Sequence, residues 1–399
     1  MPVIGVLLAL TAVSCSGLPA ANMTSTAATL SRTATTISPA ATGKTIDFAE
    51  AVAIRVVAGD DGSAWVAWTE GSELLVASVD VDSGEAGAPI VVSGPEGVIN
   101  HPLERPAMAI TADGETFVSW ITGRGNVQLA TLDSEGAITA SEVISGEARN
   151  ETALVQMIAT NDGQPVVSWL EDSTLSVATG EPLVEHELVD DLTCDCCHPV
   201  PVQIGDEVGI GYRDLEHQAD GVVRDIAFIS GTLSGTSFDA PVVVADAPWY
   251  LDACPLSGPT LAQSGDDVFI SWMDARQSLH PDQSSSSIWF DASGDGGRTF
   301  GTDVRLTNDD ATYRTPTMAV DSTGTIHLLW ERRTSDEATL EYATSSDGGQ
   351  TFSEPVDLVE GDDESGVPRE AALIAIGEQK LVSWADGLGG HIGIWPLAD

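Results

Sequence analysis

The pattern that decides the fold occurs in Thr111-Ala112-Asp113-Gly114-Glu115-Thr116-Phe117-Val118-Ser119-Trp120 and again in Asn161-Asp162-Gly163-Gln164-Pro165-Val166-Val167-Ser168-Trp169. Each stretch has an Asp-Gly turn followed by a short apolar strand that ends in Trp. The Gly of such a turn accepts the positive φ that a tight hairpin requires. An aromatic residue ends the corresponding strand in five further units, at Trp68, Tyr212, Trp272, Trp330 and Trp384.

The spacing of these aromatic residues defines the repeat. Successive members are 52, 49, 43, 60, 58 and 54 residues apart. A period near 50 residues with several short strands per unit is typical of a β-propeller blade. No stretch has a convincing helical apolar stripe, so we expect few helices. The sequence therefore predicts an all-β propeller of seven blades over residues 45–399. Six blades is the alternative, because the fourth unit has Tyr212 in place of Trp and lacks the Asp-Gly turn.

The second unit predicts the internal plan of a blade. Its four strands are expected at 107–111, 116–120, 127–131 and 138–143. The last unit ends after a third strand at 393–397, and a strand at 45–49 is expected to complete it, which closes the ring and removes an open edge. We expect the Trp that ends each second strand to pack between blades, because it is large and apolar.

The composition excludes several classes of function. The chain has 399 residues, with 61 Asp and Glu against 16 Lys and Arg, and a net charge of -45. A surface this acidic repels a phosphate backbone or an anionic lipid surface, so a nucleic-acid partner is not expected. The hydrophobic fraction of 42% with ten Trp is enough for a packed core and excludes global disorder.

The N-terminus predicts export. Residues 3–13 form an uncharged apolar run that is too short for a membrane-spanning anchor helix. The run ends in Leu10-Thr11-Ala12-Val13-Ser14-Cys15, which resembles a bacterial lipobox. We therefore expect a lipoprotein-type signal peptide at 1–14, a lipid on Cys15 and a flexible Ser/Thr/Ala-rich tether at 15–44. An ordinary signal peptide and a secreted protein is the alternative. In either case a monomer is expected, with no membrane contact other than the lipid.

Two turns carry a family resemblance. Ser293-Gly294-Asp295-Gly296-Gly297-Arg298-Thr299-Phe300 and Ser345-Ser346-Asp347-Gly348-Gly349-Gln350-Thr351-Phe352 both fit the pattern S-x-D-x-G-x-T-F and lie 52 residues apart. They resemble the Asp box (BNR repeat) of sialidase-type propellers. The resemblance implies the fold more than a chemistry, because sortilin-type receptors and photosystem assembly factors share the box without glycosidase activity. The stretch around Cys194-Asp195-Cys196-Cys197-His198 looks like a subgroup of exported bacterial propellers.

One face of the expected propeller gathers the chemistry-bearing residues. The loops that lead into the innermost strands and the ends of the second strands open on the same face near the axis. The leading loops supply Arg105, Cys197, His198, Cys254, Arg314 and Arg369, and the second-strand ends supply Glu70, Glu171, Asp172, Asp214, Asp274, Glu331 and Asp386. We therefore expect Arg and carboxylate side chains to converge at an axial mouth, with ligand contacts from Arg213, Asp214, Arg224 and Asp225.

The resemblance to sialidases implies roles for some of these residues. Arg105, Arg314 and Arg369 are then the three arginines that hold a substrate carboxylate, by the bidentate geometry that Arg provides. Asp274 or Glu331 is the acid/base, and Tyr342 is the nucleophile. The Phe/Tyr-Arg-Ile/Leu-Pro motif of sialidases is absent, and the chain has only four Tyr. The favoured hypothesis is therefore a propeller that binds a glycan or an extracytoplasmic protein at its mouth; an exo-α-sialidase-type hydrolase acting on acidic glycans is the alternative.

The cysteines form a second candidate site. Apart from Cys15, the chain has Cys194, Cys196, Cys197 and Cys254. An even number in an exported chain favours two disulfides. A Zn or Cu site with His198 and a redox-active Cys196–Cys197 pair are the alternatives. Because the two leading loops belong to neighbouring blades, we expect Cys254 to lie near the other three, within the ~7 Å between Cα atoms that a disulfide requires.

Overall fold

The computed structural model describes residues 36–37, 43–59, 62–145, 152–179, 183–233, 237–278, 280, 284–335, 337–361 and 366–397. The predicted signal peptide at 1–14, the predicted lipidation site Cys15 and most of the predicted tether lie outside this set. Every regular element in the described part is a β-strand, as the repeat predicts. Among these residues no helix has the length and apolar character needed to cross a bilayer.

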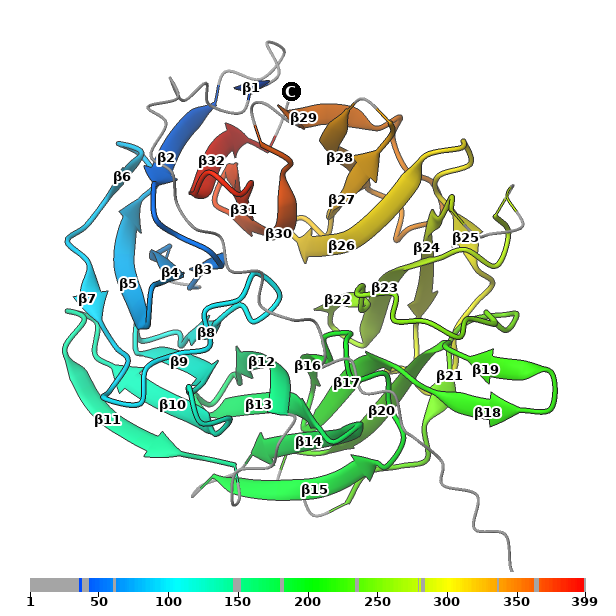
Figure 1. Ribbon diagram of the computed structural model, residues 1–399, viewed down its shortest axis with the longest axis horizontal. Helices are drawn as coiled ribbons and strands as arrows, with labels where there is room; N and C mark the ends of the chain where they lie inside the picture. Colours follow the sequence, from blue (N-terminus) through cyan, green and yellow to red (C-terminus); the bar gives the residue numbers. More distant parts are fainter. Residues whose placement is uncertain are drawn as a thin grey trace, which may run out of the picture. The chain divides into compact units, whose positions relative to one another are not determined.

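Seven four-stranded blades surround a central axis, which confirms the predicted all-β propeller (Figure 1). From the innermost strand outward, the first three blades are β3 (Ile54–Ala58), β4 (Ala64–Glu70) and β5 (Glu73–Asp80) with β6 (Glu85–Ala86) and β7 (Ile90–Val91); β8 (Ala107–Ile110), β9 (Thr116–Ile121), β10 (Val127–Leu132) and β11 (Ile138–Val143); and β12 (Thr152–Ala159), β13 (Pro165–Glu171), β14 (Thr174–Thr179) and β15 (Val184–Asp190). The strands of the second blade match the prediction to within one residue.

The remaining blades follow the same order. They are β16 (Val200–Ile204), β17 (Glu207–Arg213), β20 (Ile226–Thr232) and β21 (Val242–Val243); β22 (Thr260–Ser264), β23 (Asp267–Asp274), β24 (Ser287–Ser293) and β25 (Val304–Arg305); β26 (Thr312–Val320), β27 (Ile326–Arg333), β28 (Ala338–Ser345) and β29 (Val356–Gly361); and β30 (Arg369–Ile376), β31 (Gln379–Ala385), β32 (Gly390–Pro396) and β2 (Lys44–Phe48). A short hairpin, β18 (Glu216–Gln218) and β19 (Gly221–Val223), is inserted in the fourth blade, and β1 (Thr36–Ile37) pairs with β29.

The N-terminal strand closes the ring. Strand β2 pairs antiparallel with β32, with Ile46 opposite Ile392, so the outer strand of the last blade comes from the start of the propeller, as predicted. The innermost strands contact one another around the axis in the order β3, β8, β12, β16, β22, β26 and β30, and β30 contacts β3. Closure leaves no blade without a neighbour.

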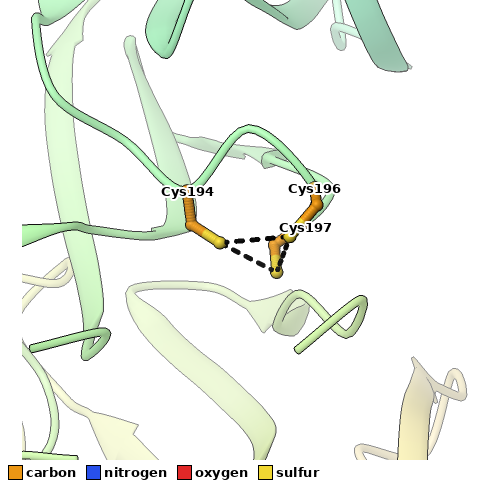
Figure 2. Close-up of side chains that lie close together, drawn as sticks. All are labelled: Cys194, Cys196 and Cys197. Atoms are coloured by element: carbon orange, nitrogen blue, oxygen red, sulfur yellow. Dashed lines mark hydrogen bonds between the residues drawn. The ribbon is translucent and has the colours of Figure 1, made fainter. Parts of the chain in front are cut away.

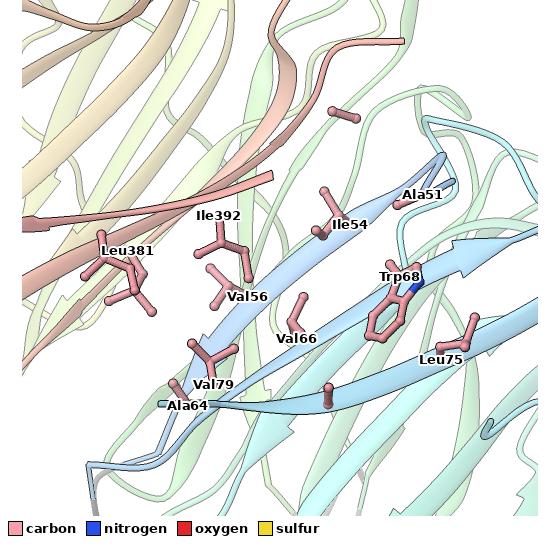
Figure 3. Close-up of a cluster of buried hydrophobic side chains, with 13 residues drawn as sticks. Ala51, Ile54, Val56, Ala64, Val66, Trp68, Leu75, Val79, Leu381 and Ile392 are labelled. Atoms are coloured by element: carbon pink, nitrogen blue, oxygen red, sulfur yellow. The ribbon is translucent and has the colours of Figure 1, made fainter. Parts of the chain in front are cut away.

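The predicted aromatic residues form the blade-to-blade cores. Trp68 of the first blade packs with Leu381 and Ile392 of the seventh in one buried apolar cluster (Figure 3). Each of the other six interfaces has an equivalent cluster, which contains Trp120, Trp169, Tyr212, Trp272, Trp330 or Trp384 together with residues of the preceding blade. Burial of these large apolar side chains stabilises each interface by several kcal/mol, at ~25 cal/mol per Å².

The two turns of the S-x-D-x-G-x-T-F pattern share one hydrogen-bond arrangement. The Ser293 hydroxyl donates to Asp295 Oδ1 (2.7 Å) and accepts from the Gly297 amide (2.8 Å). Asp295 accepts from the hydroxyl (2.6 Å) and amide (2.9 Å) of Thr299, and the turn at 345–352 repeats all four bonds. Both turns join a third strand to a fourth, so they lie on the far face, opposite the loops that lead into the innermost strands.

Candidate functional site

A cavity of about 330 Å³ lies on the propeller axis. It is lined by the innermost strands of all seven blades or by the loops that lead into them. Its walls therefore come from elements that are far apart in the sequence. Its polar lining includes Arg55, Arg105, Gln156, His198 and Ser257. Ligand sites in proteins are usually cavities of about 300–1,000 Å³ with a few convergent polar groups, and this one has the size of a small-ligand site.

Hydrogen-bond donors without partners converge on this cavity. Arg55 Nη1, from β3, donates to the Gln156 side-chain oxygen of β12 (2.5 Å). Gln156 Nε2, Arg105 Nε and His198 Nε2 are all buried and have no hydrogen-bond partner. Among the described residues, no carboxylate forms an ion pair with Arg55. Buried donors normally have partners, so the lining offers unused donors to whatever occupies the cavity.

The charges of the lining act on one another. Burial, and next the nearby charge of Arg105, lower the pKa of Arg55 to about 9, so Arg55 stays protonated at neutral pH. Burial, and next the charges of Arg105 and Arg55, hold the pKa of His198 well below its usual range. The lining therefore has a neutral imidazole and two guanidinium groups, one of which, Arg105, is paired with Glu370. The charge of Arg55 has no carboxylate partner among the described residues, in a protein with a net charge of -45.

A carboxylate pair lies beside Arg105. Arg105 donates to the backbone oxygens of Glu370 (3.0 Å) and Ala371 (3.1 Å) and forms an ion pair with the Glu370 carboxylate (3.4 Å). Burial raises the pKa of Glu370 to about 7 against the effect of Arg105, and the charge of Glu331 adds to the rise. Glu370 therefore exchanges a proton near neutral pH, which is the property of a candidate acid or base.

Four residues at or near the starts of the innermost strands have a strained backbone conformation. Leu154, Leu256, Thr315 and Glu370 all have positive φ, between 40° and 61°, a region that residues other than Gly rarely adopt. A side chain of the preceding blade accepts the amide of three of them: Glu104 accepts from Leu154 (2.9 Å), Ser257 from Thr315 (3.0 Å) and Glu331 from Glu370 (2.7 Å). Strain held by such contacts is concentrated at functional sites.

Cys194, Cys196 and Cys197 lie close together (Figure 2), in the loop that also supplies His198 to the cavity wall. Cys196 and Cys254 form a disulfide with a Cα–Cα distance of 6.4 Å, which confirms the expected link between neighbouring leading loops. Cys194 and Cys197 are buried thiols, so the structure has one disulfide where the even cysteine count favours two. The Sγ atoms of Cys194, Cys196 and Cys197 lie 3.4–3.9 Å apart.

Two arginines stabilise the sulfur cluster. Arg224 donates to Cys194 Sγ (2.9 Å) and to the Leu251 backbone oxygen (3.1 Å). Arg213 is 1% exposed and donates to the backbone oxygens of Ser257, Arg224 and Met273. The hydrogen bond between the Cys194 and Cys197 side chains, and then the charges of Arg224 and Arg213, lower the pKa of Cys194 to about 6, although burial opposes this.

The two predicted ligand-binding acids are also near the sulfur cluster. Asp214 follows β17 and donates its amide to the Asp225 backbone oxygen (2.9 Å). Asp225 accepts from the Trp249 amide (2.8 Å). Burial raises the pKa of each carboxyl to about 6, with the charge of Asp190 adding to the rise for Asp214. Arg213 and Arg224 therefore act on the sulfurs directly, and Asp214 and Asp225 lie next to them in the chain, joined to each other by a backbone hydrogen bond.

The residues with roles implied by the sialidase resemblance are only partly brought together. Arg314 donates to the Pro255 backbone oxygen (3.5 Å), and its charge acts on Glu370 beside Arg105. Arg369 lines a separate cavity of about 360 Å³ with Glu50 and Pro102. Glu331 accepts from Thr315, the Glu370 amide and Arg333.

The side chains of Asp274 and Tyr342 form contacts away from the axial cavity. Asp274 accepts from the Trp272 ring nitrogen (3.0 Å) and forms an ion pair with Arg276 (3.4 Å). The Tyr342 hydroxyl lies 2.5 Å from His327 Nδ1, toward the far-face turn after β26. Neither side chain lines the axial cavity.

Sequence reasoning missed Arg55, Gln156 and Glu370. Arg55 and Gln156 are single polar residues inside otherwise apolar innermost strands, and that exception is the one signal the sequence contains. Glu370 follows Arg369 directly. Its position beside Arg105 depends on the closure of the ring.

Comparison with known proteins places the fold. No protein-family model matches the chain, and no curated protein matches it by sequence. Among solved structures, a lectin from Burkholderia pseudomallei is similar at 14% identity with a TM-score of 0.61, over 88% of this chain and 97% of the lectin. A PL25 polysaccharide lyase, an ulvan lyase, is similar at 12% identity with a TM-score of 0.54, over 89% and 94% of the two chains. A Hadza microbial sialidase is similar at 12% identity with a TM-score of 0.48, over 84% and 76%. At these identities the similarities to the lectin and the lyase show a shared fold and no more.

Proposed function

We propose that this protein is an exported propeller that binds an acidic saccharide, with the anionic group of the saccharide in the axial cavity. The observation that carries the proposal is the set of buried polar atoms without partners around that cavity, the donors Arg105 Nε and Gln156 Nε2 and the ring atom His198 Nε2, next to Arg55, which donates a hydrogen bond to Gln156. A carboxylate or sulfate has several acceptor oxygens, so one such group satisfies donors that converge from different blades. The guanidinium of Arg55 gains the charged partner that it lacks.

The charge distribution limits the class of ligand that the cavity can bind. The net charge of -45 repels a long polyanion from the surface. A cationic cavity of about 330 Å³ on the axis still accepts one anionic group. We therefore infer a ligand with a single acidic residue at the end of a neutral chain.

The saccharide class is supported by analogy. The lectin and the polysaccharide lyase with similar folds are named for saccharide binding and cleavage, and fold-level analogy of this kind is weaker than the site itself. Export and a lipid on Cys15 are part of the proposal, supported by the apolar run and the lipobox-like sequence. Incorporation of a labelled fatty acid by the wild-type chain and not by Cys15→Ala tests the lipid.

Calorimetric titration tests the binding. The probes are glucuronic acid, galacturonic acid and N-acetylneuraminic acid, with glucose and galactose as neutral counterparts. Wild-type protein is expected to bind at least one acidic sugar and neither neutral sugar. Arg55→Gln is expected to weaken that binding by about 10–100-fold, because a hydrogen bond to a charged group contributes about 1.5–3 kcal/mol. The matched control is Arg124→Gln, which removes an exposed arginine paired with Glu96. Equal affinity of wild-type protein and Arg55→Gln would overturn the proposal.

A hydrolase is the second candidate, and Glu370 is the observation that favours it. Its pKa of about 7 and its contact with Arg105 are properties of an acid/base that serves a bound anion. Hydrolysis of a panel of fluorogenic sialosides tests this function, with Arg314→Ala and Glu370→Gln as variants. Turnover that both variants lose supports a hydrolase, and turnover no greater than that of the variants rejects it.

A further inference from the structure

The triangle of sulfurs in the leading loop of the fourth blade has the dimensions of a metal site. The Sγ atoms of Cys194, Cys196 and Cys197 are separated by 3.4, 3.5 and 3.9 Å (Figure 2). A tetrahedral zinc–thiolate site has Zn–S distances of about 2.3 Å, which place neighbouring sulfurs about 3.8 Å apart. The three sulfurs therefore already form one face of such a tetrahedron.

The fourth ligand is expected from the neighbouring blade. Cys254 Sγ is bonded to Cys196 across a Cα–Cα distance of 6.4 Å, and Cys254 packs against the cluster. Its sulfur does not group with those of Cys194 and Cys197 within 4.8 Å, so it completes the tetrahedron only after the disulfide opens and its side chain turns toward them. Asp195 has a carboxylate oxygen within 4.8 Å of both Cys196 and Cys254. His198 is not brought into this group. It lines the axial cavity, and its Nε2 is one of the buried atoms without a partner there.

The surrounding charges suit an ion bound by thiolates. A divalent ion with four thiolates has a net charge of -2, and the two guanidinium groups of Arg213 and Arg224 offset that charge. Arg224 already donates to Cys194 Sγ at 2.9 Å. Three backbone oxygens fix Arg213 beneath the cluster. Contacts of this kind orient metal ligands and change metal affinity by about 10–100-fold.

We propose that the reduced protein binds one thiophilic d¹⁰ cation, Zn²⁺ or Cu⁺, through the sulfurs of Cys194, Cys196, Cys197 and Cys254. In the disulfide form two of the four ligands are tied to each other and the site cannot form. A dithiol reductant opens it: the reductant supplies two electrons and two protons, the Cys196–Cys254 bond becomes two thiols, and the reductant becomes a disulfide. The four thiols then release their protons as the cation binds.

The site also affects the axial cavity. The same two loops contribute His198 and Ser257 to the cavity wall. The Ser257 hydroxyl accepts the Thr315 amide at 3.0 Å, so the loop around Cys254 is tied to the next blade. A cation in the sulfur cluster therefore fixes one wall of the ligand cavity.

Metal titration of the full chain tests the proposal. Protein reduced under anaerobic conditions is titrated with Zn²⁺ against a chromophoric chelator, and in a second arm with Cu⁺ against a Cu⁺-specific chelator. One equivalent of at least one cation is expected in the reduced protein and none in the unreduced protein. Co²⁺ in place of Zn²⁺ is expected to give the intense near-ultraviolet absorption of sulfur-to-cobalt charge transfer.

Variants separate the site from general effects on folding. Cys194→Ser and Cys197→Ser leave the disulfide in place, and each is expected to abolish binding at one equivalent. Arg224→Gln is expected to weaken it by about 10–100-fold. Melting of the unreduced variants shows that they fold. No stoichiometric binding of either cation by folded, reduced wild-type protein would overturn the proposal, as would unchanged binding by both serine variants. Saccharide titration of unreduced protein is independent of this result, so the two proposals fail separately.

Discussion

The carboxylates of the far-face turns and those of the mouth have pKa values shifted in opposite directions. On the far face, the hydroxyl and amide of Thr299 and the hydroxyl of Ser293 hold the pKa of Asp295 at about 2, and the equivalent bonds do the same for Asp347. On the mouth face, burial raises the pKa of Glu104 and of Glu370 to about 7. Far-face turns use Gly where φ is positive, whereas the mouth has Leu, Thr and Glu residues with positive φ.

This difference between the faces indicates that the mouth is less stable than the far-face turns. Asp295 and Asp347 each accept several hydrogen bonds in the same arrangement, in two neighbouring blades. Mouth-face groups are strained, desolvated or without partners, and they differ between blades. Such features persist in proteins where they serve a site. The far-face turns therefore stabilise the fold, and the mouth face has the features on which the proposed ligand site rests.

The largest expected effect is steric and lies on the far face. Gly349 has a φ of 85°, and a Cβ there would lie 2.1 Å from the Phe290 ring. Gly349→Ala is expected to lower the free energy of unfolding by about 2–5 kcal/mol, from the left-handed conformation and the overpacked ring together. Gly348→Ala is the control, because its φ of 72° has open space around it, and its cost is expected to be about 1–2 kcal/mol. Denaturant unfolding measures both, and equal losses would show that the ring contact is unimportant.

The next effect concerns the mouth. The Cys196–Cys254 disulfide links residues 58 apart. Reduction in the presence of a chelator is expected to lower the free energy of unfolding by about 2–4 kcal/mol, on the chain-entropy account. Thiol counting on denatured, unreduced protein lacking Cys15 is expected to give two thiols, from Cys194 and Cys197. Four thiols would show that the disulfide does not form.

The blades, their strands and the far-face turns could be predicted from the sequence. The recurrence of one aromatic residue per blade at intervals of 43–60 residues predicts the blade number, the strand positions and the closing strand, because every blade repeats the same packing. The resemblance around Asp295 and Asp347 singles out the far-face turns. The position of the leading loops also predicts that Cys254 lies near Cys194, Cys196 and Cys197, and the disulfide with Cys196 confirms this.

The unpaired character of the mouth could not be predicted. Arg55 and Gln156 lie 101 residues apart and meet only because the strands of different blades surround one axis. The raised pKa of Glu370 depends on burial and on Arg105, 265 residues earlier. Disulfide pairing within a C-x-C-C cluster depends on local geometry that spacing does not determine.

The raised pKa of Glu370 at the mouth makes the stability of the protein depend on pH. Glu370 has a raised pKa, so the folded protein keeps a proton that the unfolded chain has already lost between about pH 4.5 and 7. Its contribution to stability is therefore present below pH 4.5 and is lost as the pH rises toward 7. Glu370→Gln is expected to flatten the fall in melting temperature over this range. An unchanged pH profile would contradict the raised pKa.

The smallest expected effect has the opposite sign and lies on the far face. Asp295 has a lowered pKa of about 2, so its contribution to stability is present above about pH 4 and is lost as the pH falls through 2. Asp295→Asn is expected to destabilise the protein at pH 6 and to make less difference at pH 2. Melting temperatures of the two proteins at both pH values measure this. A variant that is equally destabilising at both would show that the carboxylate charge is not involved.

The central claim is that the axial cavity holds an anion against Arg55, and one pair of melting curves tests it most directly. Wild-type protein and Arg55→Gln are melted with and without a saturating acidic monosaccharide. We expect the variant alone to melt at or above the wild-type temperature, because it loses an unpaired buried charge, and to gain nothing from the sugar. The wild-type protein is expected to melt higher with the sugar, by the stabilisation that a ligand of the folded state provides. An equal rise for both proteins would contradict the claim.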